Sequence, residues 1–279
     1  MRPVARLLEG EPYLYRGVLY LAKGYQHPVG LVIAYPKYTA IKRSKLGDHE
    51  KLVYSSTVYW DCIKQGVTTV PLDAAYTCVN YAVSPRVLYI KSLLGPLLEA
   101  ELHLTGSAMI SESFNDVDFV VYGASDVVVE KLRAIFDRGI LDRPVSLLIE
   151  EYSKKHRGRL RLEEYLYLKK NTILHCSFKG IHINFKLVEL SRGYEGCIEP
   201  VEDYSYYSGP VEVVNALNPH RIPARYKAFA GSQEVVIESL RELYAELPAG
   251  RYYAIDSRIE KRKSGLYLVP DHGVLRPFV

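Results

Sequence analysis

The chain has 279 residues, enough to bury a large core, and such a chain usually forms two domains or one domain with additions. Its 48% hydrophobic and 24% charged residues are ordinary for a globular protein, and it shows neither a membrane-spanning apolar run nor a signal peptide, so we expect a cytoplasmic protein with no membrane partner. The net charge of +4 suits a polyanionic partner but is too small to mark a dedicated nucleic-acid-binding protein.

Cysteine usage and composition bear on the host and on metal binding. Cys62, Cys78, Cys176 and Cys197 lack the spacing of a metal site, so structural zinc is not expected. The 24 tyrosines, only 2 methionines and few glutamines are a thermophile tendency. In a hyperthermophile a disulfide would be compatible with an intracellular protein.

Residues 1–83 form an N-terminal β-rich region. From residue 13 to about residue 59, Tyr, Val, Leu and Ile are dense and are interrupted by Gly and Pro, which predicts a small antiparallel sheet or barrel. Residues 61–81 are expected to be irregular.

Residues 84–190 are predicted to form the core of the protein. Ser84 and Pro85 are a typical N-cap and first helical residue, and the helix is expected to run to residue 101 with a bend or break at Gly95-Pro96. The elements expected after it are a strand at 102–105, a turn, a strand at 118–122, a helix capped by Ser125 and stopped at Gly139, helices at 145–155 and 162–170, and a β-hairpin with arms 173–178 and 181–189.

Residues 191–279 return to β character with many aromatic residues, and one helix is predicted at 233–247. The fold class that these elements predict is α+β: a mixed sheet flanked by helices, with additional β-rich regions at both ends of the chain.

Two short motifs in the core region carry the chemistry. Asp116 and Asp118 stand two residues apart at the start of an apolar run, and in a strand both would point to the same face, as a site for a hard divalent cation requires. Upstream, Gly106 and Ser107 end another apolar segment. Glycine lets a phosphate approach the backbone, and the serine hydroxyl can bond to phosphate oxygens. Together these motifs suit metal-assisted transfer of a phosphoryl or nucleotidyl group.

The Gly106-Ser107 pair, the eight-residue gap, Asp116-Val117-Asp118 and the following Phe-Val-Val resemble the signature of the DNA polymerase beta-type nucleotidyltransferase superfamily. Residues 23–28 and 32–38 resemble the N-terminal region of predicted archaeal nucleotidyltransferases. The resemblance implies a nucleotidyltransferase-like fold and transfer of a nucleoside monophosphate from a nucleoside triphosphate to a hydroxyl, with Mg²⁺ or Mn²⁺ on Asp116 and Asp118 and the phosphates on Gly106 and Ser107. Asn115 stands where the family often has serine, and the gap is shorter than usual.

Transfer by two metal ions generally needs a third carboxylate on a neighbouring strand. The arm at 181–188 presents His182, Asn184 and Lys186 on its polar face but no acid, so Glu101 and Glu189 are the remaining candidates. We therefore predict either a working nucleotidyltransferase with an unusual metal site, or a protein of the same fold that binds nucleotide or RNA without catalysis. A purely structural scaffold is the third alternative. The acceptor, whether RNA, protein or a small molecule, is not specified by the sequence.

Other candidates are weaker. Cys62 and Cys176 are possible nucleophiles, although inert buried thiols are commoner. His27 precedes a proline and is expected in a turn. Tyr204, Tyr206 and Tyr207 are able to stack on bases but are more often packing residues of a strand. Basic residues cluster at 42–45, 154–161, 169–170 and 261–263, where solvated faces are commoner than phosphate sites.

Overall fold

The computed structural model describes residues 5–77, 83–112 and 114–279. The chain divides into two compact units, each built from two separate segments. The first unit comprises residues 1–137 and 180–198, and the second comprises residues 138–179 and 199–279. The predicted core at 84–190 therefore contributes to both units: its Asp116 strand and the following helix belong to the first, and its next two helices belong to the second. The mixture of helices and several sheets confirms the α+β class.

The N-terminal part of the first unit contains a seven-stranded antiparallel sheet, in agreement with the small antiparallel sheet or barrel predicted from its dense Tyr, Val, Leu and Ile residues. The strand order is β6-β7-β4-β2-β1-β8, and β5 pairs with β4. The strands are β1 Pro12–Tyr15, β2 Val18–Ala22, β4 Leu31–Thr39, β5 Ser44–Lys45, β6 Thr57–Trp60, β7 Gln65–Pro71 and β8 Tyr76–Thr77, with the short helices α1 Asp48–Val53 and η1 Asp61–Ile63 between them. Strand β3 Gln26–His27 pairs in parallel with β13 Tyr194–Glu195.

The expectation of irregular chain at 61–81 was wrong, because β7 and β8 lie there. Strand β7 pairs with both β4 and β6, so its structure depends on partners elsewhere in the sequence. Local composition, with Gly66 and Pro71 in this segment, does not reveal such partners. Residues 78–81, which were part of the same expectation, lie outside the described residues.

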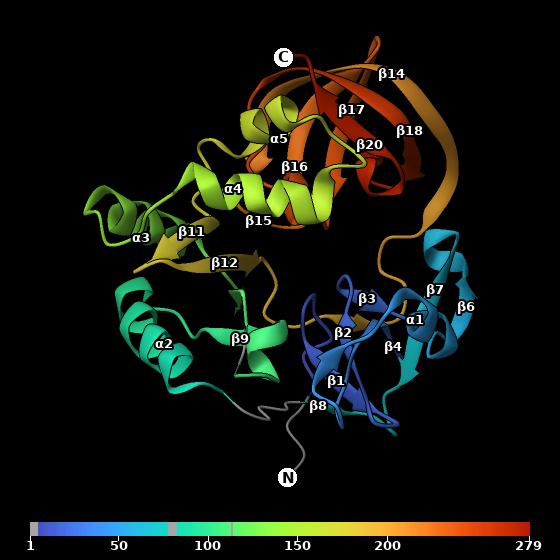
Figure 1. Ribbon diagram of the computed structural model, residues 1–279. Coiled ribbons are helices and arrows are strands. Elements are labelled where there is room, and N and C mark those ends of the chain that lie inside the picture. The colour runs from blue at the N-terminus through green and yellow to red at the C-terminus, as the bar shows by residue number, and fades with distance from the viewer. Residues whose placement is uncertain (1–4, 78–82, 113) are drawn as a thin grey trace. The chain divides into compact units, whose positions relative to one another are not determined.

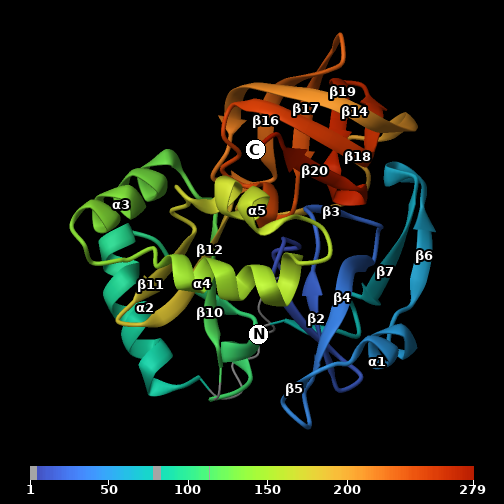
Figure 2. The same cartoon turned by 45° about the horizontal axis from the view of Figure 1, so that its top comes forward.

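The second sheet of this unit holds the carboxylate motif. Strand β10 Asp116–Tyr122 lies between β9 His103–Thr105, which is antiparallel to it, and β12 Ile181–Val188, which is parallel. Helices α2 Pro85–Leu98 and α3 Asp126–Asp137 lie together on one side of this sheet in both views (Figures 1 and 2). The predicted mixed sheet with flanking helices is thus present.

Helix α2 begins as predicted and ends differently. The Ser84 hydroxyl accepts a hydrogen bond from the Arg86 N–H, and Pro85 is the first helical residue. The helix continues through Pro96 to Leu98, so Gly95-Pro96 does not break it, and the helix ends before the expected Glu101. Pro96 lies in the last turn, where the loss of one N–H donor interrupts little, and Glu99 terminates the helix in the left-handed conformation.

Two segments from the N-terminal part of the first unit pack against the sheet that contains β10 and against the turn after β9. Leu8 packs with Val120 and Val188, and Tyr38 and Leu19 pack with Met109 and Ile110. The N-terminal sheet and the segment before it therefore border the face of β10 that carries the two aspartates.

In the second unit, the strands after residue 199 form a sheet that closes on itself. The order β14-β16-β17-β19-β18-β20 is completed by pairing of β14 with β18 (Figure 2). The elements of the unit are α4 Val145–Glu151, the π-helical turn Tyr152–His156, α5 Leu162–Lys169, β11 His175–Phe178, β14 Val201–Asn218, β15 Arg221–Ile222, β16 Ala224–Ala230, β17 Gln233–Ser239, η4 Glu242–Tyr244, β18 Gly250–Arg262, β19 Gly265–Val269, η5 Pro270–His272 and β20 Val274–Pro277.

The helix predicted at 233–247 was wrong. Residues 233–239 form β17, which pairs with β16 around a tight turn at Gly231. The β-branched residues Val235, Val236 and Ile237 favour a strand, and all seven residues of β17 pair with β16. Only the single helical turn η4 remains of the expected helix.

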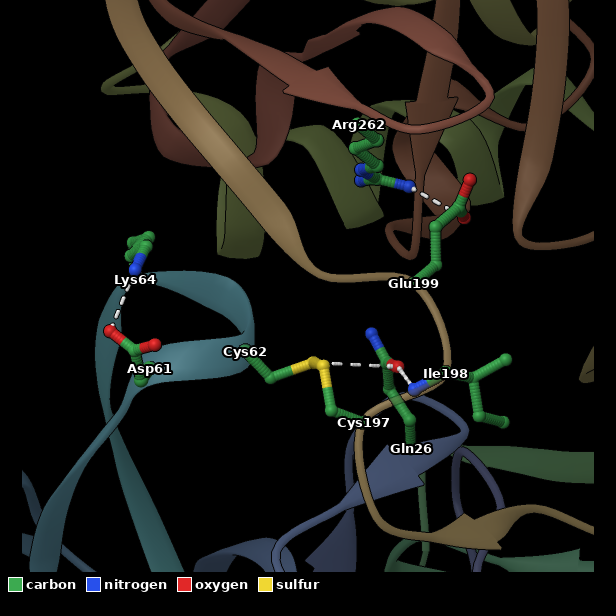
Figure 3. Close-up of a disulfide and its surroundings, with 8 residues drawn as sticks. All are labelled: Gln26, Asp61, Cys62, Lys64, Cys197, Ile198, Glu199 and Arg262. Atoms are coloured by element: carbon green, nitrogen blue, oxygen red, sulfur yellow. Dashed lines mark hydrogen bonds and ion pairs between the residues drawn. A yellow bond between two sulfur atoms is a disulfide. The ribbon is translucent and has the colours of Figure 1, made fainter.

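Cys62 and Cys197 form a disulfide within the first unit. The bridge joins the turn η1 to the chain that leaves β13, and the sulfur of Cys62 lies 3.7 Å from the Oε1 atom of Gln26, which also accepts a hydrogen bond from the Ile198 N–H (Figure 3). Cys176 is buried and is not part of a disulfide. The bridge therefore fastens the end of the unit's second segment to its N-terminal sheet.

We predict that removal of this disulfide lowers stability strongly. The bridged residues are 135 positions apart, and closing a loop of that length restricts the unfolded chain by about 5 kcal/mol in the chain-entropy treatment. Cys62→Ser/Cys197→Ser should melt at a lower temperature than the oxidised wild type and should not respond to dithiothreitol. A wild type whose melting temperature is the same with and without reductant would contradict the prediction.

Candidate active site

Asp116 and Asp118 lie on the same face of β10, as their spacing predicts. Asn184 of β12 stands directly opposite Asp118, and its Nδ2 atom donates to Asp118 Oδ1 at 2.8 Å and to Asp116 Oδ2 at 3.3 Å. The two carboxylate oxygens are therefore no more than about 6 Å apart. Both aspartates are half-buried, and Asn184 is buried. A small, anionic, oxygen-lined position results at the start of the strand.

Gly106 is required where it stands. Its backbone has φ +73° and ψ −158°, a conformation that side chains rarely allow, and a Cβ atom placed there would lie 2.1 Å from Asp118 Oδ2. The turn between β9 and β10 thus approaches the Asp118 carboxylate closely. Sequence analysis assigned the glycine a role toward phosphate, but its contact in this structure is with the aspartate.

Ser107 follows as the first residue of the helical turn η2 Ser107–Met109. Its hydroxyl makes no hydrogen bond with any residue in the described part of the chain. Met109 and Ile110, which come next, anchor the turn in the apolar cluster with Tyr38. The serine is therefore held in place by its neighbours while its hydroxyl stays available to a ligand.

A buried carboxylate that sequence analysis missed organises the adjoining part of the face. Glu9 is 2% exposed, and its Oε1 atom accepts from the ammonium groups of Lys23 at 2.6 Å and Lys186 at 3.2 Å. Its Oε2 atom accepts from the Gly24 N–H at 3.0 Å. Burial raises the pKa of Glu9, but the two lysines lower it more, so the net pKa lies below its ordinary value. Glu9 is thus an anion that positions two lysines.

A β-bulge turns a third lysine toward the same region. Leu19 pairs with Tyr38 and the next residue, Tyr20, pairs with Pro36, so Lys37 is the extra residue of β4. In a bulge two successive side chains are directed to nearly the same side of the strand. Burial raises the pKa of the Tyr38 hydroxyl, and the negative charges of the two aspartates raise it further.

The pKa of Lys37 is also affected by the charged groups around this site. Burial lowers the pKa of its ammonium group, and the positive charges of Lys45, Lys23 and Lys186 lower it further. The carboxylate of Asp118 acts in the opposite direction. Lys37 makes no ion pair or side-chain hydrogen bond with the residues that the structure describes.

Neither acid proposed as a third metal ligand lies near the aspartate pair. Glu101 precedes β9 and interacts with His103 at 3.2 Å, a residue that pairs with Val120 toward the far end of β10. Glu189 follows Val188, which stands opposite the last residue of β10. Each is four or five strand residues from Asp118 or its partner, or roughly 13–16 Å at the rise of a strand. The position beside the pair is filled by Asn184.

The cysteine and histidine candidates have structural roles. Cys62 is in a disulfide, and burial raises the pKa of the Cys176 thiol, so neither is an activated nucleophile. His27 is buried, with its Nε2 atom 2.9 Å from the Leu7 carbonyl oxygen and its Nδ1 atom accepting from the Ile33 N–H at 3.1 Å. It is a core histidine and not a turn residue at the surface.

The aromatic candidates of β14 differ from one another. Tyr204 and Tyr206 are exposed and contact each other edge to face, with centroids 6.0 Å apart. Tyr207 packs over Gly209 and donates to the Pro210 carbonyl oxygen. The predicted packing role therefore fits Tyr207 and, in part, Tyr204, because the Arg258 guanidinium carbon lies 4.4 Å from the Tyr204 ring centroid. Tyr206 is 64% exposed.

Of the predicted site residues, the structure brings Gly106, Asp116 and Asp118 into one position and leaves Ser107 beside them. The residues that sequence analysis did not assign are Glu9, Lys23 and Lys37. The two lysines could have been noticed in the sequence because each is a charged residue within or next to an apolar strand: Lys23 directly follows β2, and Lys37 lies within β4. No such signal marks Glu9.

Comparisons with protein-family models, with curated proteins and with solved structures found no match to this chain. Within the described residues, every helix is too short or too polar to cross a lipid bilayer.

We predict that Gly106→Ala disrupts the site beyond the cost of backbone strain. A Cβ atom would displace the Asp118 carboxylate, so we expect a loss of about 3 kcal/mol in unfolding free energy and much weaker divalent-cation binding. Gly30→Ala is the matched control, because Gly30 also has φ +73° but a Cβ atom there meets nothing within 4 Å. Equal effects of the two substitutions in urea unfolding would show that the contact with Asp118 is unimportant.

Proposed function

We propose that this protein is a metal-dependent nucleotidyltransferase, which transfers a nucleoside monophosphate from a nucleoside triphosphate to a hydroxyl acceptor. The observation that carries the proposal is the pair of carboxylates on β10, held together by one amide group and closely approached by the turn at Gly106. A nucleotidyltransferase-like fold, with the parallel β10–β12 pair at its centre, is part of the same proposal.

The donor set fits Mg²⁺ or Mn²⁺. Carboxylate oxygens are the ligands that these hard cations prefer, and Asp116 and Asp118 would hold the ion. Two unit charges about 6 Å apart repel by about 3 kcal/mol at an effective dielectric constant of about 20. The Asn184 amide offsets part of that repulsion with partial positive charge only. When bound, the cation would neutralise the charge of a triphosphate and polarise its α-phosphorus.

The residues of the chain would position the substrates. The Ser107 hydroxyl donates to a phosphate oxygen, and Gly106, which has no Cβ atom, lets the turn that carries Ser107 lie close against the Asp118 carboxylate. The acceptor oxygen then forms a bond to the α-phosphorus, the bond from this phosphorus to the pyrophosphate oxygen breaks, and the acceptor gives up its proton to a base. Pyrophosphate leaves and the acceptor carries the nucleotide.

A second candidate function is nucleotide or RNA binding without catalysis. Asn184 favours it, because this neutral amide stands where a third carboxylate would complete the metal site. Binding of a metal–triphosphate complex needs mainly Asp116, Asp118 and phosphate oxygens. Activation of the attacking hydroxyl needs a further negative charge, so turnover should be slow where binding persists.

The direct test is incubation with each labelled nucleoside triphosphate and Mg²⁺ or Mn²⁺, with RNA and protein acceptors, while pyrophosphate release is followed. In a second measurement, the melting temperature of the wild type should rise when Mg²⁺ and ATP are added, because the cation relieves the repulsion between the two carboxylates. The melting temperature of Asp116→Asn/Asp118→Asn should rise much less. Equal thermal shifts for the two proteins would remove the metal site. Thermal shifts without transfer would favour the binding function.

Asn184→Asp is expected to make the protein more dependent on metal. Without a cation, the substitution replaces two hydrogen bonds with repulsion among three carboxylates, and the melting temperature should fall. With Mn²⁺ it should recover most of this loss, and transfer should become faster than in wild type. Because Asn184 contacts both aspartates, a variant with unchanged metal affinity and unchanged rate would show that this pair does not hold the metal.

A further inference from the structure

The lysines next to the carboxylate pair have no role in the function proposed so far. Lys23 and Lys186 meet at one oxygen of Glu9, and Lys37 is turned to the same region by the bulge in β4. Lys186 and Asp118 are on one face of the sheet, since Lys186 pairs with Val120, two residues after Asp118. The ammonium groups therefore adjoin the anionic position at the start of β10.

In the metal-free protein, the negative charges of Glu9, Asp116 and Asp118 offset most of the positive charge of the lysines, and the exposed Lys45, which also acts on Lys37, leaves a small positive excess. Glu9 supplies one negative charge to two lysines, and Asp118 is the acid that acts on Lys37. A divalent cation on the aspartates would cancel that negative charge. The lysines would then carry a larger excess of positive charge in a partly buried place, which is costly unless an anion enters with the cation.

The Ser107 hydroxyl adds a neutral donor to the same place. Tyr38, the second residue of the bulge, packs on Met109 and Ile110, which directly follow Ser107 in the chain. The turn that begins at Ser107 and the bulge that carries Lys37 are therefore in contact through their neighbours.

We propose that Lys37, together with Ser107 and the Glu9-bound pair Lys23 and Lys186, forms a subsite for the polyphosphate chain of the substrate. This subsite rests on the proposed function, because it takes the substrate to be a nucleoside triphosphate. It assigns the β- and γ-phosphates to Ser107, to Lys186 of β12, and to Lys23 and Lys37 of the N-terminal region. Mg²⁺ at the aspartates and a polyphosphate at the lysines each favour binding of the other.

The probe for this subsite is inorganic tripolyphosphate, which has the phosphate chain of the substrate without a base or ribose. Titration calorimetry in EDTA measures its binding without metal, and titration with Mg²⁺ measures the coupling. Wild type should bind in EDTA and at least tenfold more tightly with Mg²⁺. Lys37→Met should weaken binding at least tenfold in both conditions, and Lys37→Arg should restore much of it.

Lys42→Met is the control, because Lys42 is an exposed lysine of the same sheet, in the turn between β4 and β5. It should bind like wild type. Equal affinities for wild type, Lys37→Met and Lys42→Met, or no binding by wild type, would overturn the subsite. Circular dichroism melts establish that the variants are folded, since Lys37 makes no ion pair with the described residues whose loss would unfold the sheet.

The same experiments separate this inference from the proposed function. Asp116→Asn/Asp118→Asn should lose the Mg²⁺ enhancement but still bind tripolyphosphate in EDTA. If nucleotidyl transfer is absent while Lys37→Met weakens tripolyphosphate binding, the subsite is supported and the proposed reaction is not. If transfer is present and Lys37→Met leaves both tripolyphosphate affinity and the KM for ATP unchanged, the subsite is refuted and the reaction is retained.

Discussion

Two carboxylates that must share one small position on β10 constrain the rest of the first unit. Asp116 and Asp118 are kept together by the Nδ2 atom of Asn184, which can reach both because β10 and β12 run parallel with Asn184 opposite Asp118. The same crowding requires glycine at 106, since any Cβ atom there would meet Asp118. The register of β10 and β12 and the conformation of the turn at Gly106 thus both depend on how the Asp116 and Asp118 carboxylates are accommodated side by side.

The N-terminal sheet contributes positive charge near these carboxylates. It brings Lys23 and Lys37 to a face that Asp116 and Asp118 of β10 make acidic at one end, and it buries Glu9 as the anion that holds Lys23 and Lys186. Because a buried charge is tolerated only with partners, Glu9 and its lysines must be retained or lost together. The disulfide between Cys62 and Cys197 fastens the segment after β12 to this sheet and so stabilises the assembly of the unit from its two segments.

These relations also bear on catalysis. Because Asn184 is a neutral amide in the place of a third carboxylate, the metal-free protein has less repulsion among its carboxylates. The same amide lacks the negative charge that would help to activate an attacking hydroxyl. If the proposed function and subsite are right, the lysines beside the site add affinity for phosphates but supply no base for the acceptor hydroxyl. The proposal therefore predicts tight binding of a metal–polyphosphate complex and slow transfer.

The sequence by itself determined the features that depend on nearby residues. The spacing of Asp116 and Asp118 placed both on one face of a strand, the Ser84-Pro85 pair began a helix, and the order of helices and strands in the core followed from hydrophobic periodicity. The tertiary structure decided what depends on partners distant in sequence: β17 is a strand because β16 pairs with it, β7 because β4 and β6 do, and Cys62 pairs with a cysteine 135 residues away. Glu9 and Lys37 joined the site for the same reason, since the burial of one and the bulge of the other exist only once the sheets have packed.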